Sequence, residues 1–147
     1  MFFEEFEIGV TIDVGAQTVQ AMDVDRFIDL VGLNNPIFVS DEGARSVGHP
    51  RRVVPGPLQF SLAMGLGQKA GLFDKMVVGA QFDNLRFHHP LHPGDTLHMK
   101  ALPIAKRVTS NPSKGIVILE YELTNQADEK IMTTTGTYLF LTHAKRP

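Results

Sequence analysis

The 147-residue sequence contains no cysteine and no tryptophan. The lack of cysteine excludes disulfide-stapled scaffolds, thiol nucleophiles and cysteine-ligated metal centres. It also leaves no redox signal about the compartment, so a cytoplasmic location is only the default expectation. Most of the aromatic content comes from ten phenylalanines, which fit an ordinary apolar core and a large apolar tunnel equally well.

The sequence also lacks an excess of either charge, with 14 Lys and Arg against 16 Asp and Glu and a formal net charge of -2. This balance disfavours a disordered tail and a surface for nucleic acid. A secretory leader would carry Lys or Arg near its start, whereas the first residues include Glu4, Glu5 and Glu7. The longest uncharged stretch, between Arg52 and Lys69, is too short to span a membrane. We therefore expect a soluble protein that binds neither nucleic acid nor membrane.

No repeat, linker or low-complexity stretch divides residues 1–147, so we expect a single domain. The first half mixes helices with irregular loops. Asp23 fits as the N-cap of a first helix, which the Asn-Asn-Pro run would end. A second short helix is expected to begin near Ser40 or Asp41 and to fade by Gly48.

A third helix is predicted from Pro57 to Ala70. Pro57 suits the first position of a helix, where its missing N–H is no loss. The residues that follow are apolar on nearly every side, whereas a surface helix would show a polar stripe. We therefore expect this helix to be enclosed and to extend for about 20 Å, enough to cross a sheet. Gly71 fits the left-handed position that ends many helices.

The second half of the sequence alternates as strands do. Residues Gly115 to Asn125 place Leu119, Tyr121 and Leu123 on one face, with polar residues on the other. The expected strands are 11–19, 76–87, 96–108, 115–125 and 131–142. About five antiparallel strands and one long buried helix define an α+β fold, in which a sheet curled around the helix would cover its apolar surface.

Three sequence blocks occur in a recognisable order: Gly32-Leu33-Asn34-Asn35-Pro36-Ile37-Phe38, Val53-Val54-Pro55-Gly56 and Pro93-Gly94-Asp95-Thr96-Leu97. Together they resemble the MaoC-like dehydratases, the (R)-specific enoyl-CoA hydratase family with the hot-dog fold. The resemblance spans almost the whole chain. It implies an antiparallel sheet wrapped around a long central helix, and an acyl-CoA or acyl-carrier thioester as the ligand.

In this family the first block reads Gly-Asp-x-Asn-Pro-Ile-His, and its Asp and His add water to, or remove it from, an α,β-unsaturated acyl thioester. The resemblance places Leu33 at the Asp position and Phe38 at the His position. Neither side chain can carry a proton, and general acid–base groups commonly contribute ~10²–10⁴-fold to the rate. The resemblance also implies that Asn35 shapes the overhanging segment, that the Gly56 N–H polarises the thioester carbonyl, and that Ser61 supports the catalytic pair.

Other polar residues are candidates for the missing chemistry. Asp41 and His49 could form a shifted acid–base pair, although first-turn acids of a helix and a surface histidine explain them more simply. Arg51 and Arg52, with Arg45, would lie around the mouth of the pocket. Arginine binds phosphate well, so these residues would hold coenzyme A or balance the acidic N-terminal residues.

The densest histidine cluster comprises His88, His89, His92 and His98. Neighbouring residues of a strand face opposite ways, so His88 and His89 do not easily chelate one ion. We expect no metal and no cofactor.

Three functions remain open from the sequence. The first is an enoyl-CoA hydratase or dehydratase of fatty acid metabolism that uses substitute residues. The second is a non-catalytic protomer that shapes the acyl pocket of a heteromeric hydratase, which suits Leu33 and Phe38 as tunnel-lining residues. The third is an acyl-CoA-binding module. Family members pair their sheets edge to edge, so the resemblance implies a homodimer or a heteromer with a catalytic paralogue.

Overall fold

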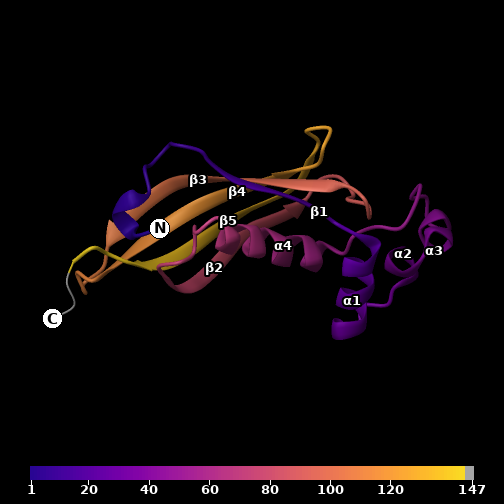
Figure 1. Ribbon diagram of the computed structural model, residues 1–147, viewed down its shortest axis with the longest axis horizontal. Coiled ribbons are helices and arrows are strands. Elements are labelled where there is room, and N and C mark those ends of the chain that lie inside the picture. Colours follow the sequence, from indigo (N-terminus) through magenta and orange to yellow (C-terminus); the bar gives the residue numbers. More distant parts are fainter. Residues whose placement is uncertain (145–147) are drawn as a thin grey trace.

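Five strands form one antiparallel sheet in the computed structural model, which describes residues 1–144 (Figure 1). They are β1 (Ile12–Thr18), β2 (Met76–Phe87), β3 (Thr96–Val108), β4 (Lys114–Thr124) and β5 (Lys130–Leu141). The order across the sheet is β1-β3-β4-β5-β2, so β1 and β2 are its two edges. The expected α+β class and all five strands are confirmed, and no strand end differs from the expectation by more than one residue.

The long helix α4 (Gly56–Lys69) lies along one face of this sheet (Figure 1). Its side chains Leu58, Ala63 and Leu66 are buried. Alternate residues of the strands are buried beneath it, among them Leu119 and Tyr121 of β4. This alternation creates one apolar face on the sheet, and the main core of the protein lies between that face and α4.

Two details of α4 differ from the expectation. The helix begins at Gly56, so Pro57 occupies its second position. Pro57, Ser61 and Gly65 are exposed and lie four residues apart, so they form a solvent-facing stripe. The helix is therefore not enclosed, because a single five-stranded sheet covers only one side of it.

The end of α4 follows the sequence prediction. Gly71 has a φ of 77°, in the left-handed region. The N–H of Leu72 donates to the carbonyl of Gly67 at 2.9 Å, and the N–H of Gly71 donates to the carbonyl of Gln68 at 3.0 Å. These two bonds satisfy carbonyls that the last turn of a helix leaves open.

Three short helices lie together at one end of the sheet (Figure 1): α1 (Ala21–Val31), α2 (Pro36–Val39) and α3 (Asp41–Arg45). The predicted N-cap of the first helix is wrong, because α1 is capped by Gln20. Asp23 sits in the first turn and accepts the N–H of Gln20 at 2.8 Å. The α3 start is confirmed, since the hydroxyl of Ser40 accepts the N–H of Gly43 at 3.0 Å.

The helix α2 was not predicted. The Asn-Asn-Pro run is expected to end the first helix and to shape the segment after it, but Asn35 and Pro36 also begin the next helix. The Asn35 side chain accepts the N–H of Ile37 at 3.1 Å, and Pro36 occupies an early helical position. Proline can end one helix and start the next because it has no backbone N–H, which a helix interior needs and a first turn does not. The asparagine side chain favours a helix start because it accepts an N–H of the first turn.

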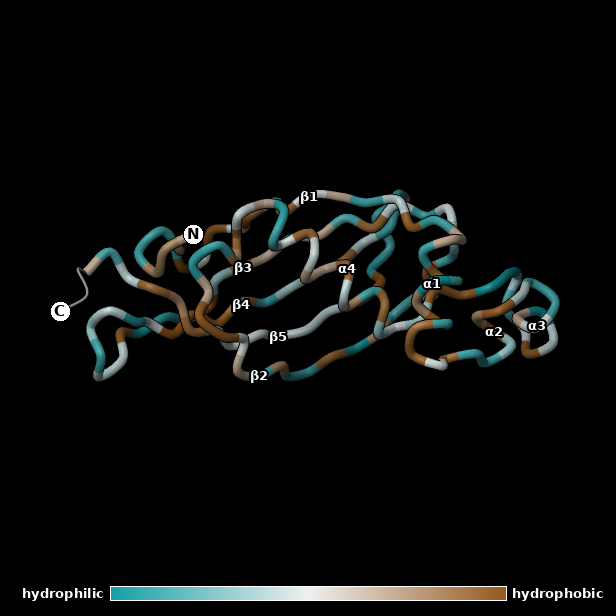
Figure 2. Tube along the Cα trace, turned by 60° about the horizontal axis from the view of Figure 1, so that its bottom comes forward, coloured by the Kyte–Doolittle hydropathy of each residue, from teal (hydrophilic) through white to brown (hydrophobic). Residues whose placement is uncertain are grey.

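The edge strand β2 is the most exposed part of the sheet, and only one of its residues is even half-buried. Figure 2 shows apolar residues recurring along this edge. Its large exposed apolar side chains are Met76, Val77, Val78, Phe82, Leu85 and Phe87. Within residues 1–144, no helix is both long enough and apolar enough to cross a membrane.

Candidate functional site

Leu33, between α1 and α2, and Phe38, within α2, pack against the apolar core, and both side chains are partly buried. The N–H of Leu33 donates to the carbonyl of Ile28 at 3.1 Å, and the N–H of Phe38 donates to the carbonyl of Asn35 at 2.9 Å. Local hydrogen bonds therefore hold both backbones in place. At the two positions where the resemblance expects acid–base groups, the chain presents apolar surface.

The start of α4 carries the expected helix-start donor. The N–H of Gly56 is the first of the helix and has no hydrogen-bond acceptor within residues 1–144. A Cβ atom added to Gly56 would lie 2.6 Å from the ring of Phe87, so the strand β2 packs directly against this turn. Ser61 is exposed, and its hydroxyl donates to the carbonyl of Pro57 at 2.9 Å.

The candidate substitutes Asp41 and His49 have separate partners. The Asp41 carboxylate accepts the backbone N–H of Arg52 at 2.9 Å and lies 3.9 Å from the guanidinium of Arg45. The backbone N–H of His49 donates to the carbonyl of Ala44 at 3.1 Å. No hydrogen bond joins the two side chains in the part of the chain that the structure describes, so the pair has no acid–base geometry.

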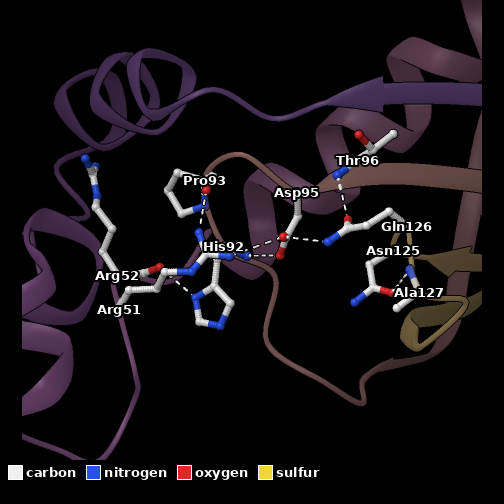
Figure 3. A network of polar contacts seen from close by, with 9 residues as sticks. All are labelled: Arg51, Arg52, His92, Pro93, Asp95, Thr96, Asn125, Gln126 and Ala127. Carbon is white, nitrogen blue, oxygen red and sulfur yellow. Dashed lines mark hydrogen bonds and ion pairs between the residues drawn. The ribbon is translucent and has the colours of Figure 1, made fainter.

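Arg51 and Arg52 point in different directions from adjacent positions (Figure 3). Arg51 donates to the carbonyl of Pro93 at 2.6 Å and to the carboxylate of Asp95 at 3.3 Å. Arg52 donates to the carboxylate of Asp25 at 2.7 Å and to the carbonyl of Phe38 at 3.0 Å. The Arg51 guanidinium therefore connects its loop to the turn before β3, whereas the Arg52 guanidinium connects the same loop to α1 and α2.

Asp95 is the centre of this polar network, and only 6% of its surface is exposed. Besides Arg51, it accepts the N–H of His92 at 2.8 Å and the side-chain amide of Gln126 at 2.9 Å. Figure 3 shows these groups converging from three separate segments. Because a buried carboxylate needs such partners, the Pro-Gly-Asp block of the sequence has a structural role here.

The four clustered histidines also have individual partners. His88 pairs with Thr133 and His98 with Asp13, each at 2.8 Å, whereas His89 and His92 pair with backbone carbonyls at 2.9 Å. No group of three or more His, Cys, Asp or Glu among residues 1–144 has a metal-holding arrangement.

An aromatic cluster that the sequence does not predict lies between α4 and the β2 side of the sheet. The rings of Phe60 on α4 and Phe82 on β2 meet edge to face, with centroids 4.7 Å apart. Behind them lies Tyr138, whose ring centroid is 5.8 Å from that of Phe82. The spacing of phenylalanines along β2 was the only available signal, and it could not indicate which strand would form an edge.

The phenols next to this cluster are neutral. Burial raises the pKa of Tyr138 to about 12, and it also raises the pKa of Tyr121. The hydroxyl of Tyr138 donates to the sulfur of Met64 at 3.7 Å. Neither group can act as a base near neutral pH.

Two sizeable cavities lie away from this region. One, of about 530 Å³, is lined by residues that include Lys100, Glu120 and Thr133. These three residues alternate along their strands with buried residues, so this cavity lies on the sheet face opposite α4. The other, of about 430 Å³, is lined by Arg51 and Arg52 with neighbouring helical residues. Neither is lined by Leu33, Phe38 or Gly56. Neither cavity therefore encloses the segment expected to bind a thioester.

A five-stranded antiparallel sheet with a long helix along one face defines the hot-dog class. Solved structures share this architecture. A putative MaoC domain protein dehydratase from Chloroflexus aurantiacus superposes with a TM-score of 0.91 and 24% identity, covering 100% of this chain and 43% of that one. A Mycobacterium tuberculosis protein with a double hot-dog fold gives a TM-score of 0.83 and 20% identity, covering 100% of this chain and 46% of that one.

The chain belongs to the family described as FAS1-like, dehydratase domain region, whose model matches residues 7–134. This membership agrees with the resemblance to MaoC-like dehydratases. Among curated proteins, the mesaconyl-CoA hydratase of Cereibacter sphaeroides is 27% identical over 133 residues, which are 90% of this chain. The chain spans only 38% of the length of that relative.

Proposed function

We propose that this chain is a non-catalytic hot-dog unit of an acyl-thioester hydratase. It forms one side of the acyl pocket, and a second hot-dog unit supplies the Asp and His that move protons. The observation that carries this proposal is the apolar pair Leu33 and Phe38, which packs against the core at the positions where the family places its acid–base groups.

The ligand class follows from the family and from the α4 start. The curated relative is by name a hydratase of a coenzyme A thioester. The free N–H of Gly56 lies at the positive end of a 14-residue helix. Such a donor suits the oxygen of a thioester carbonyl, which gains negative charge when the conjugated double bond is attacked.

The requirement for a second unit is supported by the shape of the chain. The β2 edge leaves backbone groups unpaired and exposes large apolar side chains, which a single chain in water would normally cover. The longer related structure with a double hot-dog fold carries two such units in one chain. We propose that the catalytic unit is a paralogue bound at the β2 edge, because a second copy of this chain would again carry Leu33 and Phe38. In the purified chain, a second copy can cover the same edge.

An assay of crotonyl-CoA hydration tests this function. The reaction is monitored as a decrease in the absorbance of the conjugated thioester. The purified wild-type chain should give no rate above buffer. Leu33→Asp combined with Phe38→His should create activity at least ~10²-fold above the wild type, because it restores two proton-transfer groups. Hydration by the wild-type chain alone would overturn the proposal.

A matched control places the same residue types elsewhere. Leu30→Asp with Val47→His changes two apolar residues that are 83% and 65% exposed and outside the candidate site. This variant should remain inactive. A folded Leu33→Asp, Phe38→His variant that binds crotonyl-CoA without any gain in activity would show that positions 33 and 38 do not face the thioester.

A further inference from the structure

We propose that Phe60, Phe82 and Phe87 form the wall against which the acyl group lies, and that the Phe60–Phe82 pair restricts this chain to short acyl groups. These three residues are called the aromatic wall below. This inference rests on the proposed function, and in particular on a thioester carbonyl at the Gly56 N–H.

The wall begins at the proposed carbonyl position. The ring of Phe87 lies so close to Gly56 that a Cβ there would be 2.6 Å from it. Phe87 is nevertheless 48% exposed, so one side of its ring remains available to a ligand. A carbonyl bound at the start of α4 therefore has an aromatic surface directly beside it.

One helical turn after Gly56, the Phe60–Phe82 pair forms the end of the aromatic wall. Phe60 is four residues after Gly56, which corresponds to about 6 Å along the helix axis. There its ring meets that of Phe82 edge to face, with an interplanar angle of 90° and centroids 4.7 Å apart. An acyl group that leaves the carbonyl along α4 reaches this pair after a short apolar segment.

Buried core residues pack against the Phe60–Phe82 pair and restrict movement of the Phe82 ring toward the core. Phe82 contacts the buried ring of Tyr138, which in turn stacks on Phe73 with centroids 5.3 Å apart. Tyr138 is only 1% exposed. Since protein interiors are close-packed, moving Phe82 inward would displace core side chains.

In the single chain the wall is exposed at the β2 edge, where the proposed second unit would complete the pocket around the acyl group. Phe82 is 38% exposed even though it contacts both α4 and the core. Aromatic rings offer a flat, apolar and weakly polar-edged surface. A short conjugated acyl group is also flat and apolar, so it can stack against these rings.

The test is isothermal titration calorimetry of the purified full chain, in the assembly that it forms, with crotonyl-CoA and trans-2-octenoyl-CoA as probes and coenzyme A as the reference. The wild type should bind crotonyl-CoA more tightly than octenoyl-CoA. Phe82→Ala removes the closing ring and should shift the affinity ratio toward octenoyl-CoA by about tenfold or more. Phe82→Leu, which keeps an apolar contact with the core, should shift it by less.

Leu30→Ala, at an exposed position of α1, is the matched control and should leave the ratio unchanged. Equal or tighter wild-type binding of octenoyl-CoA, or an unchanged ratio in both folded Phe82 variants, would overturn the aromatic wall while leaving the proposed function intact. Binding of both thioesters no tighter than coenzyme A itself would instead remove the proposed function and this inference with it.

Discussion

At the scale of single residues, Asp95 determines how the helical end of the protein is joined to the sheet. Its carboxylate is almost fully buried and accepts hydrogen bonds from Arg51, His92 and Gln126. Arg51 is itself 44% exposed at its side chain, so the ion pair lies at the boundary with solvent. The network is stabilising mainly because it satisfies several donors around one buried acceptor.

Asp95→Ala should lower the free energy of unfolding by about 2–3 kcal/mol, because it leaves these donors without their acceptor. Urea denaturation followed by circular dichroism measures the change. Asp29→Ala, which removes an exposed carboxylate from α1, is the control and should change stability by less than about 0.5 kcal/mol. Equal effects of the two substitutions would mean that the network contributes little.

At the scale of elements, two glycines in the second half of α4, Gly65 and Gly67, have opposite surroundings. A Cβ at Gly67 would lie 2.3 Å from the ring of Phe73, whereas a Cβ at Gly65 would meet nothing within 4 Å. Gly65 is exposed and Gly67 is buried. Packing therefore does not require a glycine at position 65, whereas Gly67 allows the end of the helix to approach the core closely.

These surroundings predict opposite effects of the same substitution. Gly67→Ala should destabilise the protein by about 1–3 kcal/mol through overpacking, although alanine favours helices. Gly65→Ala should instead stabilise it by up to about 1 kcal/mol through helix propensity alone. Thermal unfolding of both variants beside the wild type measures the difference, and a gain in stability from Gly67→Ala would contradict the packing described here.

The sequence predicted the positions of the helices and strands well, but it predicted less well which of their faces are buried. The strand β4 was recognised because alternate burial of Leu119, Tyr121 and Leu123 is a local, period-two pattern. The cap at Gly71 was recognised because it depends on one residue's φ. The sequence does not predict the solvent-facing stripe of α4, because Ser61 is its only polar side chain and the other two members are Pro57 and Gly65.

At the scale of the whole molecule, the exposed β2 edge is the feature that a second hot-dog unit would cover. Val77 and Val78 are 44% and 48% exposed on this strand. The strand also has irregular register with β5 in three places, and Asn84 has a positive φ of 52°. Such bulges hinder the addition of an arbitrary β-strand to this edge. The edge is therefore better suited to one specific partner than to unspecific strand pairing.

Val78→Lys should weaken association at this edge, because it places a charge where apolar contact is proposed. Sedimentation velocity of the purified chain should show a two-chain species for the wild type and a shift toward the single chain for the variant. Val108→Lys, at a 54% exposed position near the end of β3, should leave the two-chain species unchanged. A wild type that stays a single chain would restrict the proposed interface to a partner of different sequence.

By itself, the sequence determined the fold class, the strand segments and the absence of acid–base groups at Leu33 and Phe38, because periodicity, caps and side-chain chemistry are local properties. Only the tertiary structure decided that β2 is an edge, that Phe82 and Phe60 meet, and that Arg51 binds an aspartate 44 positions away rather than standing free. Contacts between distant segments depend on how the whole sheet is ordered, and no local pattern carries that information.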